Sequence, residues 1–232
     1  IEAINTVLQR GVWSPLVTFG QEGDWQAKRI ADDGSQFELW YQSTCLGTVT
    51  WGILGVHNVA NALSACAAAV QAGVLLEQLV PALISFQGVR RRMEYVLQHR
   101  GLTIFDDFAH HPTAIASALR SLRAKVNQDP ITVFLECGSR TMQSGVHQNE
   151  LVQALSCADH LMLLDHQDMQ WDVITLREQL SCSVQCYDSV ETMFSTWQPD
   201  LDVSQSAILM SNKSYDGLKE KFSSLHIIKI WK

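Results

Sequence analysis

From residue 93 onward, short apolar runs alternate with longer segments that have helical spacing. The apolar runs cover residues 93–98, 102–106, 131–135, 160–164, 182–187, 207–210 and 227–231. Helices are expected near residues 112–126, 148–156, 172–180, 190–197 and 215–224. Apolar strands separated by helices of this length indicate an α/β fold, because parallel neighbours need long crossover connections. We therefore predict a mostly parallel sheet flanked by helices.

The beginning of the chain has a different pattern. A short helix is expected over residues 1–11. Four short runs follow, punctuated by glycines, at residues 16–19, 25–30, 37–41 and 47–51. They predict an antiparallel β-meander, in which Asp33-Gly34 is a good hairpin signal.

Two helices are expected to connect this meander to the α/β part. The first is rich in alanine and runs from about residue 54 to Gly73, and the second covers about residues 76–86. Pro81 lies inside the second helix, where proline costs about 3 kcal/mol, so a kink or a later start is expected. We place a domain boundary at Gly88, which gives domains of residues 1–87 and 88–232.

Composition excludes several classes of protein. The chain has 232 residues, 47% of them hydrophobic, and a net charge of −7. This acidic balance argues against a general nucleic-acid binder, whose binding surface is basic. No apolar run is long enough to span a membrane, and no basic-then-apolar leader opens the sequence. We therefore expect a cytoplasmic protein with neither a nucleic-acid nor a membrane partner.

The six cysteines are scattered singly through the chain. They occupy positions 45, 66, 137, 157, 182 and 186, and no Cys-x-x-Cys pair occurs. This spacing suits neither a zinc ribbon nor a small disulfide scaffold. We predict reduced thiols and no protein metal site.

Polar residues gather where one predicted strand meets the next helix. Residues 106–115 read Asp-Asp-Phe-Ala-His-His-Pro-Thr-Ala-Ile, so two carboxylates and two histidines lie at this turn. Pro112 suits the first helical position, where its missing N–H costs nothing. Taken singly, an Asp here is often only a helix cap, and adjacent histidines are often surface residues. In α/β sheets, however, ligands bind at such carboxyl-end turns.

The whole string resembles the signature that opens the C-terminal domain of the Mur ligase family. Within that family it is most similar to the murein peptide ligase branch, because the alanine-adding branch has Tyr-Gly where this chain has Phe108-Ala109. Two further stretches are similar to family motifs, residues 55–62 (Gly-Val-His-Asn-Val-Ala-Asn-Ala) and 90–94 (Arg-Arg-Arg-Met-Glu). The resemblance implies a Rossmann-like C-terminal domain, preceded by the meander and helices that end a central ATP-binding domain.

The resemblance also implies roles for individual residues. ATP would be bound through its adenine by His57, Asn58 and Asn61, through its phosphates by Arg92 and secondarily Arg91, and through its ribose by Asp107. His110 and His111 would face the reacting centre as the candidate catalytic residues.

Two loops and one absence depart from the family pattern. Residues 135–142 fall where the family has an Arg-containing loop, and Arg140 is the candidate substitute for that arginine. Residues 210–217 keep Ser211 and Asn212 for substrate binding, but three expected glycines are replaced. No Gly-Lys dipeptide occurs, so no P-loop is expected. The chain therefore corresponds to the latter half of the family, without the UDP-sugar domain.

As a portion of a murein peptide ligase, the chain would belong to an enzyme that uses ATP and Mg²⁺. That enzyme would join UDP-N-acetylmuramate to L-Ala-γ-D-Glu-meso-diaminopimelate, the murein tripeptide, through an acyl phosphate. It would act in peptidoglycan recycling, and so in cell-wall biogenesis, cell shape and cell division. The chain alone is expected to be inactive and to need the missing N-terminal half. Two alternatives are a portion of a UDP-N-acetylmuramate–L-alanine ligase and a non-catalytic binding or regulatory remnant.

Overall fold

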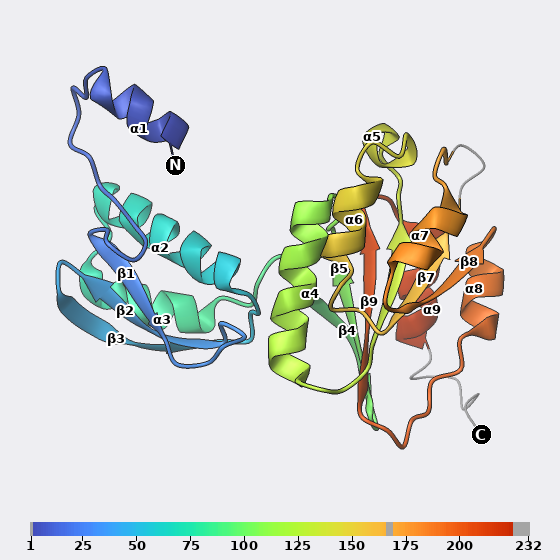
Figure 1. Cartoon of the computed structure of the whole chain (residues 1–232). Coiled ribbons are helices and arrows are strands. Elements are labelled where there is room, and N and C mark those ends of the chain that lie inside the picture. The colour runs from blue at the N-terminus through green and yellow to red at the C-terminus, as the bar shows by residue number, and fades with distance from the viewer. Residues whose placement is uncertain (1, 166–168, 225–232) are drawn as a thin grey trace. The chain divides into compact units, whose positions relative to one another are not determined.

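The computed structural model describes residues 2–165 and 169–224, which form two compact units (Figure 1). The N-terminal unit comprises Ile1–Trp51 and Val56–Phe86, and the C-terminal unit comprises Gly52–Gly55 and Gln87–Lys232. The strand predicted at residues 227–231 lies outside the described residues.

The N-terminal unit contains an antiparallel sheet and three helices, as predicted, but the sheet has three strands where four runs were expected. Trp25, Phe37, Leu39 and Val49 are buried in this sheet. Residues 16–19, predicted as a fourth run of the meander, form only an isolated bridge from Phe19 to Trp25. The elements are α1 (Glu2–Gln9), β1 (Trp25–Arg29), β2 (Gln36–Tyr41), β3 (Thr44–Thr50), α2 (Val56–Gln71) and α3 (Leu76–Ser85).

Two local features of this unit differ from simple sequence rules. The β2–β3 turn consists of Gln42 and Ser43, both with positive φ (45° and 69°), although neither is the glycine that such a turn favours. Helix α3 runs without interruption through Pro81, because it packs on β3 with Leu79 buried and tolerates the lost hydrogen bond.

The C-terminal unit is built on a six-stranded sheet of order β4-β5-β9-β6-β7-β8. Only the edge strand β4 is antiparallel to its neighbour, so the predicted mostly parallel sheet is confirmed. The strands are β4 (Glu94–His99), β5 (Leu102–Asp107), β6 (Ile131–Glu136), β7 (His160–Leu164), β8 (Ser183–Tyr187) and β9 (Gln205–Ser211). The helices are α4 (Pro112–Val126), α5 (Arg140–Gln143), α6 (Gln148–Ala154), α7 (Val173–Gln179), α8 (Val190–Thr196), the 3₁₀ turn η1 (Tyr215–Gly217) and α9 (Leu218–Ser224).

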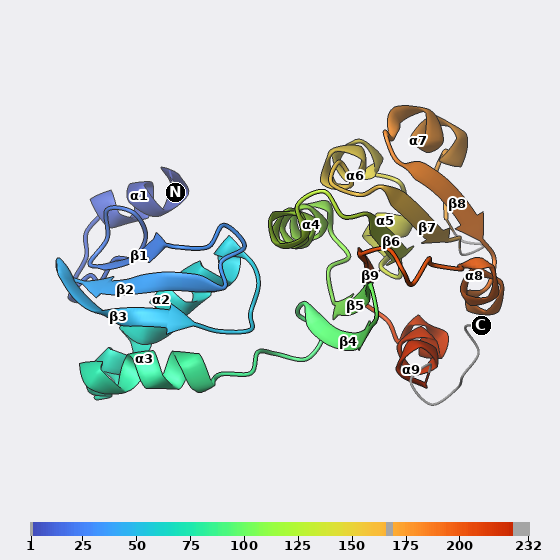
Figure 2. The same cartoon turned by 90° about the horizontal axis from the view of Figure 1, so that it is seen from below.

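Helices cover both faces of this sheet and form two separate cores (Figure 2). Alternate side chains of one strand enter different cores, because successive residues of a strand point to opposite faces. In β6, for example, Val133 and Leu135 pack with α4, α6 and α7, whereas Phe134 packs with α8 and α9. The result is a three-layer α/β/α arrangement. Because apolar side chains fill both faces of the sheet, polar groups gather at the ends of the strands.

Candidate functional site

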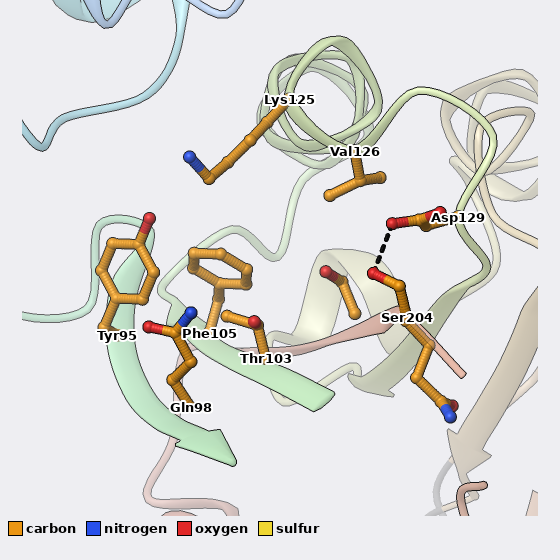
Figure 3. A pocket seen from close by; sticks show the side chains of 10 residues that line it. Tyr95, Gln98, Thr103, Phe105, Lys125, Val126, Asp129 and Ser204 are labelled. Carbon is orange, nitrogen blue, oxygen red and sulfur yellow. Dashed lines mark hydrogen bonds between the residues drawn. The ribbon is translucent and has the colours of Figure 1, made fainter. Parts of the chain in front are cut away.

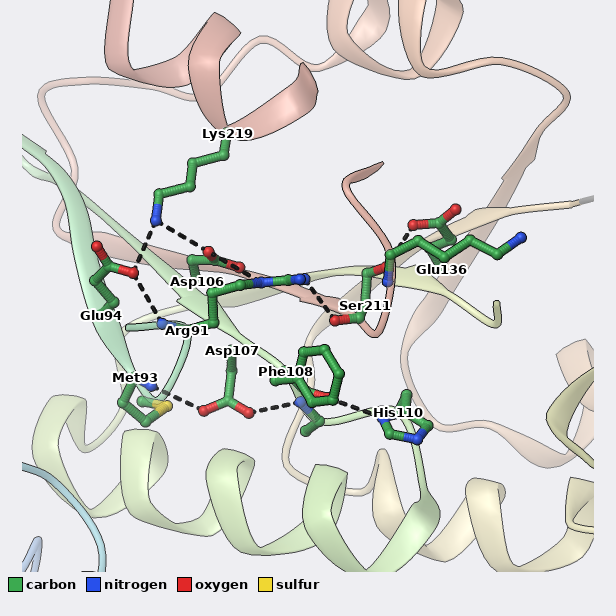
Figure 4. A network of polar contacts seen from close by, with 12 residues as sticks. Arg91, Met93, Glu94, Asp106, Asp107, Phe108, His110, Glu136, Ser211 and Lys219 are labelled. Atoms are coloured by element: carbon green, nitrogen blue, oxygen red, sulfur yellow. Dashed lines mark hydrogen bonds and ion pairs between the residues drawn. The ribbon is translucent and has the colours of Figure 1, made fainter. Parts of the chain in front are cut away.

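Three central strands bring polar residues together at their carboxyl ends. Strands β5, β9 and β6 are direct neighbours, with Asp107 opposite Met210 and Glu136 opposite Ser211. Segments far apart in the sequence therefore end side by side (Figure 4). This is the edge at which parallel α/β sheets bind ligands.

Asp107 holds two parts of the backbone in place. Its Oδ2 accepts a hydrogen bond from the Met93 N–H at 2.8 Å, and its Oδ1 accepts one from the Ala109 N–H at 2.7 Å. The residue is only 4% exposed, and burial raises the pKa of its carboxyl despite these bonds and the nearby charge of Arg92. Asp107 thus connects the segment before β4 to the turn before α4.

Arg91 is also engaged within the C-terminal unit. Its Nη2 donates to the Ser211 carbonyl oxygen at 2.6 Å, and its Nε lies 3.5 Å from the Asp106 carboxylate. Its backbone N–H donates to Glu94 at 2.8 Å, in a left-handed conformation with φ of 57°. Arg91 therefore stabilises the approach to β4 rather than presenting its charge outward.

Lys219 of α9 completes this network (Figure 4). Its Nζ lies 2.8 Å from Glu94 and 3.1 Å from Asp106. Burial opposes ionisation of both Glu94 and Lys219, but their mutual pairing prevails, so the pKa of Glu94 is lowered and that of Lys219 is raised. This contact could not be predicted from local sequence patterns, because Glu94 and Lys219 are 125 residues apart.

Arg92 differs from its neighbour. It is exposed, and its guanidinium carbon lies 5.6 Å from the centre of the Phe108 ring. It forms no ion pair with any residue that the structure describes. Of the two arginines predicted to contact phosphate, Arg92 is the one whose positive charge is available to a ligand.

The two predicted histidines have different surroundings. The Nδ1 of His110 lies 2.9 Å from the Phe108 carbonyl oxygen, which can only accept. In neutral His110 the proton is therefore on Nδ1, and Nε2 is left as an acceptor. His111 instead caps α4, its Nδ1 accepting from the Thr113 N–H at 3.4 Å, and its ring lies 4.7 Å from that of His147.

The ends of β6 and β9 are held together by buried polar groups. Ser211 Oγ donates to the Glu136 carboxylate and accepts from the Lys213 N–H at 2.8 Å. Asn212 Oδ1 is the one buried side-chain polar atom without a hydrogen-bond partner in the described ranges. A Cβ on Gly138 would lie 2.6 Å from that oxygen, so any larger residue there would displace the Asn212 side chain.

The remaining predicted residues lie at two other places. Arg140 is exposed and begins α5, a helix that the sequence did not predict and that is capped by Ser139. His57, Asn58 and Asn61 lie on the first turns of α2 in the N-terminal unit, where Asn61 Nδ2 donates to Asn58 Oδ1 at 3.2 Å.

The loop that lost the expected glycines keeps an unusual backbone. Tyr215, Asp216 and Gly217 all have positive φ, of 56°, 42° and 80°. Side chains other than glycine adopt this region at a cost of about 1 kcal/mol or more each. The buried Tyr215 side chain, whose hydroxyl contacts Met193 Sδ at 3.9 Å, fixes this conformation.

The described residues contain no cluster of metal ligands, no membrane-spanning helix and no disulfide. Within residues 2–165 and 169–224, no group of three His, Cys, Asp or Glu side chains could hold a metal ion. None of the helices in these ranges has the length and apolar character needed to cross a bilayer. All six cysteines are free thiols, as predicted.

Comparison with known proteins gives consistent matches. The family described as "Mur ligase, glutamate ligase domain" matches residues 91–211. A UDP-N-acetylmuramate–L-alanyl-γ-D-glutamyl-meso-2,6-diaminoheptandioate ligase of Haemophilus influenzae is 33% identical over 95% of this chain and 49% of its own length. A UDP-N-acetylmuramate–L-alanine ligase of Roseiflexus is 37% identical, but over only 49% of this chain and 26% of its own length.

A solved structure is also similar to this chain. The murein peptide ligase of Psychrobacter arcticus is 31% identical, with a TM-score of 0.66 over 95% of this chain and 48% of its own. The chain thus spans about half the length of the curated relatives that it matches.

Proposed function

Because this chain belongs to the Mur ligase family, we propose that it is the C-terminal portion of a murein peptide ligase. The whole enzyme would use ATP to join UDP-N-acetylmuramate to L-Ala-γ-D-Glu-meso-diaminopimelate in the cytoplasm during peptidoglycan recycling. The N-terminal unit would end the central ATP-binding domain, and the C-terminal unit would be the C-terminal domain. The convergence of Asp107, His110, Ser211 and Asn212 at one sheet edge is the observation that carries this proposal.

The extent of similarity favours the peptide-adding reaction over the alanine-adding one. The relative named for the tripeptide matches 95% of the chain, whereas alanine ligases match between 49% and 71% of it. The backbone at Tyr215 and Asp216 weighs against a degenerate remnant, since both residues adopt the left-handed conformation that glycine favours although neither is glycine.

The residues present fit a nucleotide. Asn58 and Asn61 offer amide donors and acceptors on an exposed turn, as an adenine edge requires. Arg92 presents an exposed guanidinium that forms no ion pair with a described residue, and such a group is suited to phosphate. Bound Mg²⁺ would neutralise phosphate charge, and its ligands would come from the phosphates and the remainder of the protein. We assign Arg91 and Asp107 mainly to positioning, because their side-chain polar groups are already engaged.

The proposed reaction forms an amide bond at the expense of an acyl phosphate. The amine nitrogen of the tripeptide attacks the acyl carbon, the bond from that carbon to the phosphate oxygen breaks, and inorganic phosphate leaves. The nitrogen must lose a proton, and we assign its acceptance to His110 Nε2, because the contact of Nδ1 with the Phe108 carbonyl leaves Nε2 as the acceptor. Asn212 Oδ1, buried and without a partner in the described part of the chain, suits an N–H of the peptide, and Arg140 suits one of its carboxylates.

Reconstitution would test this proposal. We expect the 232-residue chain alone to be inactive, and activity to appear when the N-terminal half of the Haemophilus relative is supplied. ADP release and ligated product would be measured with tripeptide and, separately, with L-alanine as acceptor. His110→Asn should lower turnover about a hundredfold or more. His160→Asn is the matched control, because His160 is exposed at the amino end of β7 and bonds Ser183.

The outcomes separate the alternatives. Preference for L-alanine would assign the chain to the other branch. No turnover from two halves that bind each other and are both folded would favour a non-catalytic remnant. An equal loss of turnover in the His110→Asn and His160→Asn variants would show that His110 does not take part in the reaction.

A further inference from the structure

A second polar pocket lies at the opposite end of the same sheet, between α4 and strands β4 and β5 (Figure 3). Its volume is about 210 Å³. Thr103 lies four residues before Asp107 on β5, which corresponds to about 13 Å along a strand. The pocket is therefore separate from the proposed ligase site. It is lined by Tyr95, Gln98, Thr103, Phe105, Lys125, Val126, Asp129, Ser204, Gln205 and Ser206.

A β-bulge shapes this pocket. Tyr95 pairs with Phe105 and Leu97 with Ile104, so Val96 is an extra residue in β4. In a regular strand, Tyr95 and Gln98 would point to opposite faces, because they are three residues apart. The bulge brings both onto the face covered by α4, which is how bulges re-aim side chains near binding sites.

The floor of the pocket is polar, and its groups are not used by the fold. Gln98, Thr103 and Ser206 stand opposite one another across three strands. Ser206 is only 4% exposed, yet its hydroxyl, like the polar side-chain atoms of Gln98 and Thr103, has no hydrogen-bond partner among the described residues. Beside this row, Tyr95 (46% exposed) lies with its ring 4.7 Å from that of the buried Phe105. These polar side chains line the pocket and form no hydrogen bonds with the described residues, so they are available to a ligand.

One positive and one negative charge face this floor from different sides. Arg123, in the last turn of α4, is fully used to hold the loop through the carbonyls of Asn127, Asp129 and Cys157. Lys125, in contrast, forms no ion pair within the part of the chain that is described. Asp129 is fixed by its backbone and by Ser204, whose hydroxyl donates to Oδ2 at 2.6 Å. Figure 3 shows Lys125 near the Tyr95 hydroxyl, with Asp129 and Ser204 across the pocket.

We propose that this pocket binds a small zwitterion, either a free amino acid or the charged ends of a dipeptide. The carboxylate would lie at Lys125 and the Tyr95 hydroxyl, and the ammonium at Asp129. The Gln98–Thr103–Ser206 row would bind the polar atoms between them. A simple anion would be repelled by Asp129, and a simple cation would be repelled by Lys125. A zwitterion carries both charges and can pair with both residues.

Titration of the ¹⁵N-labelled chain, followed by NMR, would test the pocket directly. L-Glutamine is the first probe and glycylglycine the second, which distinguishes a free amino acid from a peptide. Glutamine should shift the amide signals of Thr103 and Ser206 and leave those of Asp107 and Ser211 unchanged. N-acetyl-glutamine, which lacks the ammonium, and glutamine amide, which lacks the carboxylate, should each bind about tenfold more weakly, in line with the loss of one charged contact.

Variants complete the test. Lys125→Met and Asp129→Asn should each weaken glutamine binding about tenfold, and both keep the local shape. Arg120→Met is the control, because Arg120 is exposed on the same helix and does not line the pocket. The proposal is overturned if glutamine and glycylglycine leave the pocket signals unmoved, if glucose or acetate binds as tightly, or if the folded Lys125 and Asp129 variants bind like wild type.

Discussion

The two ends of the parallel sheet in the C-terminal unit use their polar side chains in different ways. At the carboxyl end, Asp106 and Asp107 each bond two partners, and Ser211 bonds both Glu136 and the Lys213 backbone. At the amino end, Lys125 and the Gln98–Thr103–Ser206 row have no such bonds within the described residues. The same types of side chain thus stabilise the fold at one end and are available to a ligand at the other.

This difference also separates neighbouring residues at the carboxyl end. Arg91 and Arg92 are adjacent and chemically identical, yet one is engaged by Asp106 and Ser211 and the other faces outward. A motif therefore identifies where a site lies, whereas hydrogen bonds identify which of its residues remain for binding. Four substitutions measure this contrast.

Asp107→Ala should have the largest effect on stability. It leaves the buried N–H groups of Met93 and Ala109 without acceptors, each of which costs about 1–3 kcal/mol. We expect the free energy of unfolding, measured in urea, to fall by about 2–4 kcal/mol. Asp107→Asn, which keeps one acceptor oxygen, should lie between this variant and wild type. A loss no greater than that of the exposed control Asp202→Ala would contradict a positioning role.

Ser211→Ala should come second. Its hydroxyl is buried between Glu136 and the Lys213 N–H, and removal leaves a buried carboxylate with one bond fewer. The expected loss is about 2 kcal/mol in the same urea experiment. Wild-type stability would show that the bonds at the carboxyl end add nothing to the fold.

Lys219→Met should cost about 1 kcal/mol at neutral pH, because the partly exposed pair is screened by solvent. The lowered pKa of Glu94 means that this stability is present above its ordinary value of 4.5 and is lost as pH falls through the folded value. The raised pKa of Lys219 means that it is present below 10.5 and is lost as pH rises further. Unfolding curves of variant and wild type should therefore converge at both extremes. A difference that is constant with pH would exclude the ion pair as its cause.

Ser204→Ala should have the smallest effect, within about 0.5 kcal/mol, since this exposed hydroxyl at the amino end bonds Asp129 alone among the described residues. It is the direct counterpart of Ser211→Ala. Equal losses in the free energy of unfolding of Ser204→Ala and Ser211→Ala would show that the two ends of the sheet do not differ in this way.

Local sequence patterns predicted most of the helices and strands, but not the contacts between them. The buried runs of β6, β7 and β9 and the helix at residues 112–126 were found because each depends on residues close in sequence. Helix α5 was missed because four residues are too few to show periodicity. The Gln42-Ser43 turn was missed because its left-handed backbone contains no glycine.

The sequence predicted the strand-to-helix turn of the candidate site, but not the contacts within it. Residues 105–115 predicted that Asp107 and His110 lie between a strand and a helix, and they lie between β5 and α4. Neither Lys219 nor Glu136 was assigned a role, since their partners are 125 and 75 residues away and spacing along the chain cannot reveal such pairs. The left-handed backbone at Arg91 determines which of the two arginines faces outward. This conformation cannot be predicted from the residue types.

The position of β9 has a consequence for the order in which this protein can be made. β9 is the last strand of the described sheet to be synthesised, yet it lies in the middle, between β5 and β6. Until residues 205–211 have left the ribosome, β5 and β6 each have an edge without a partner, and such edges invite wrong pairing. Ser211 and Asn212 also arrive with this strand. The domain therefore acquires its central pairing and its candidate site together, when this strand emerges.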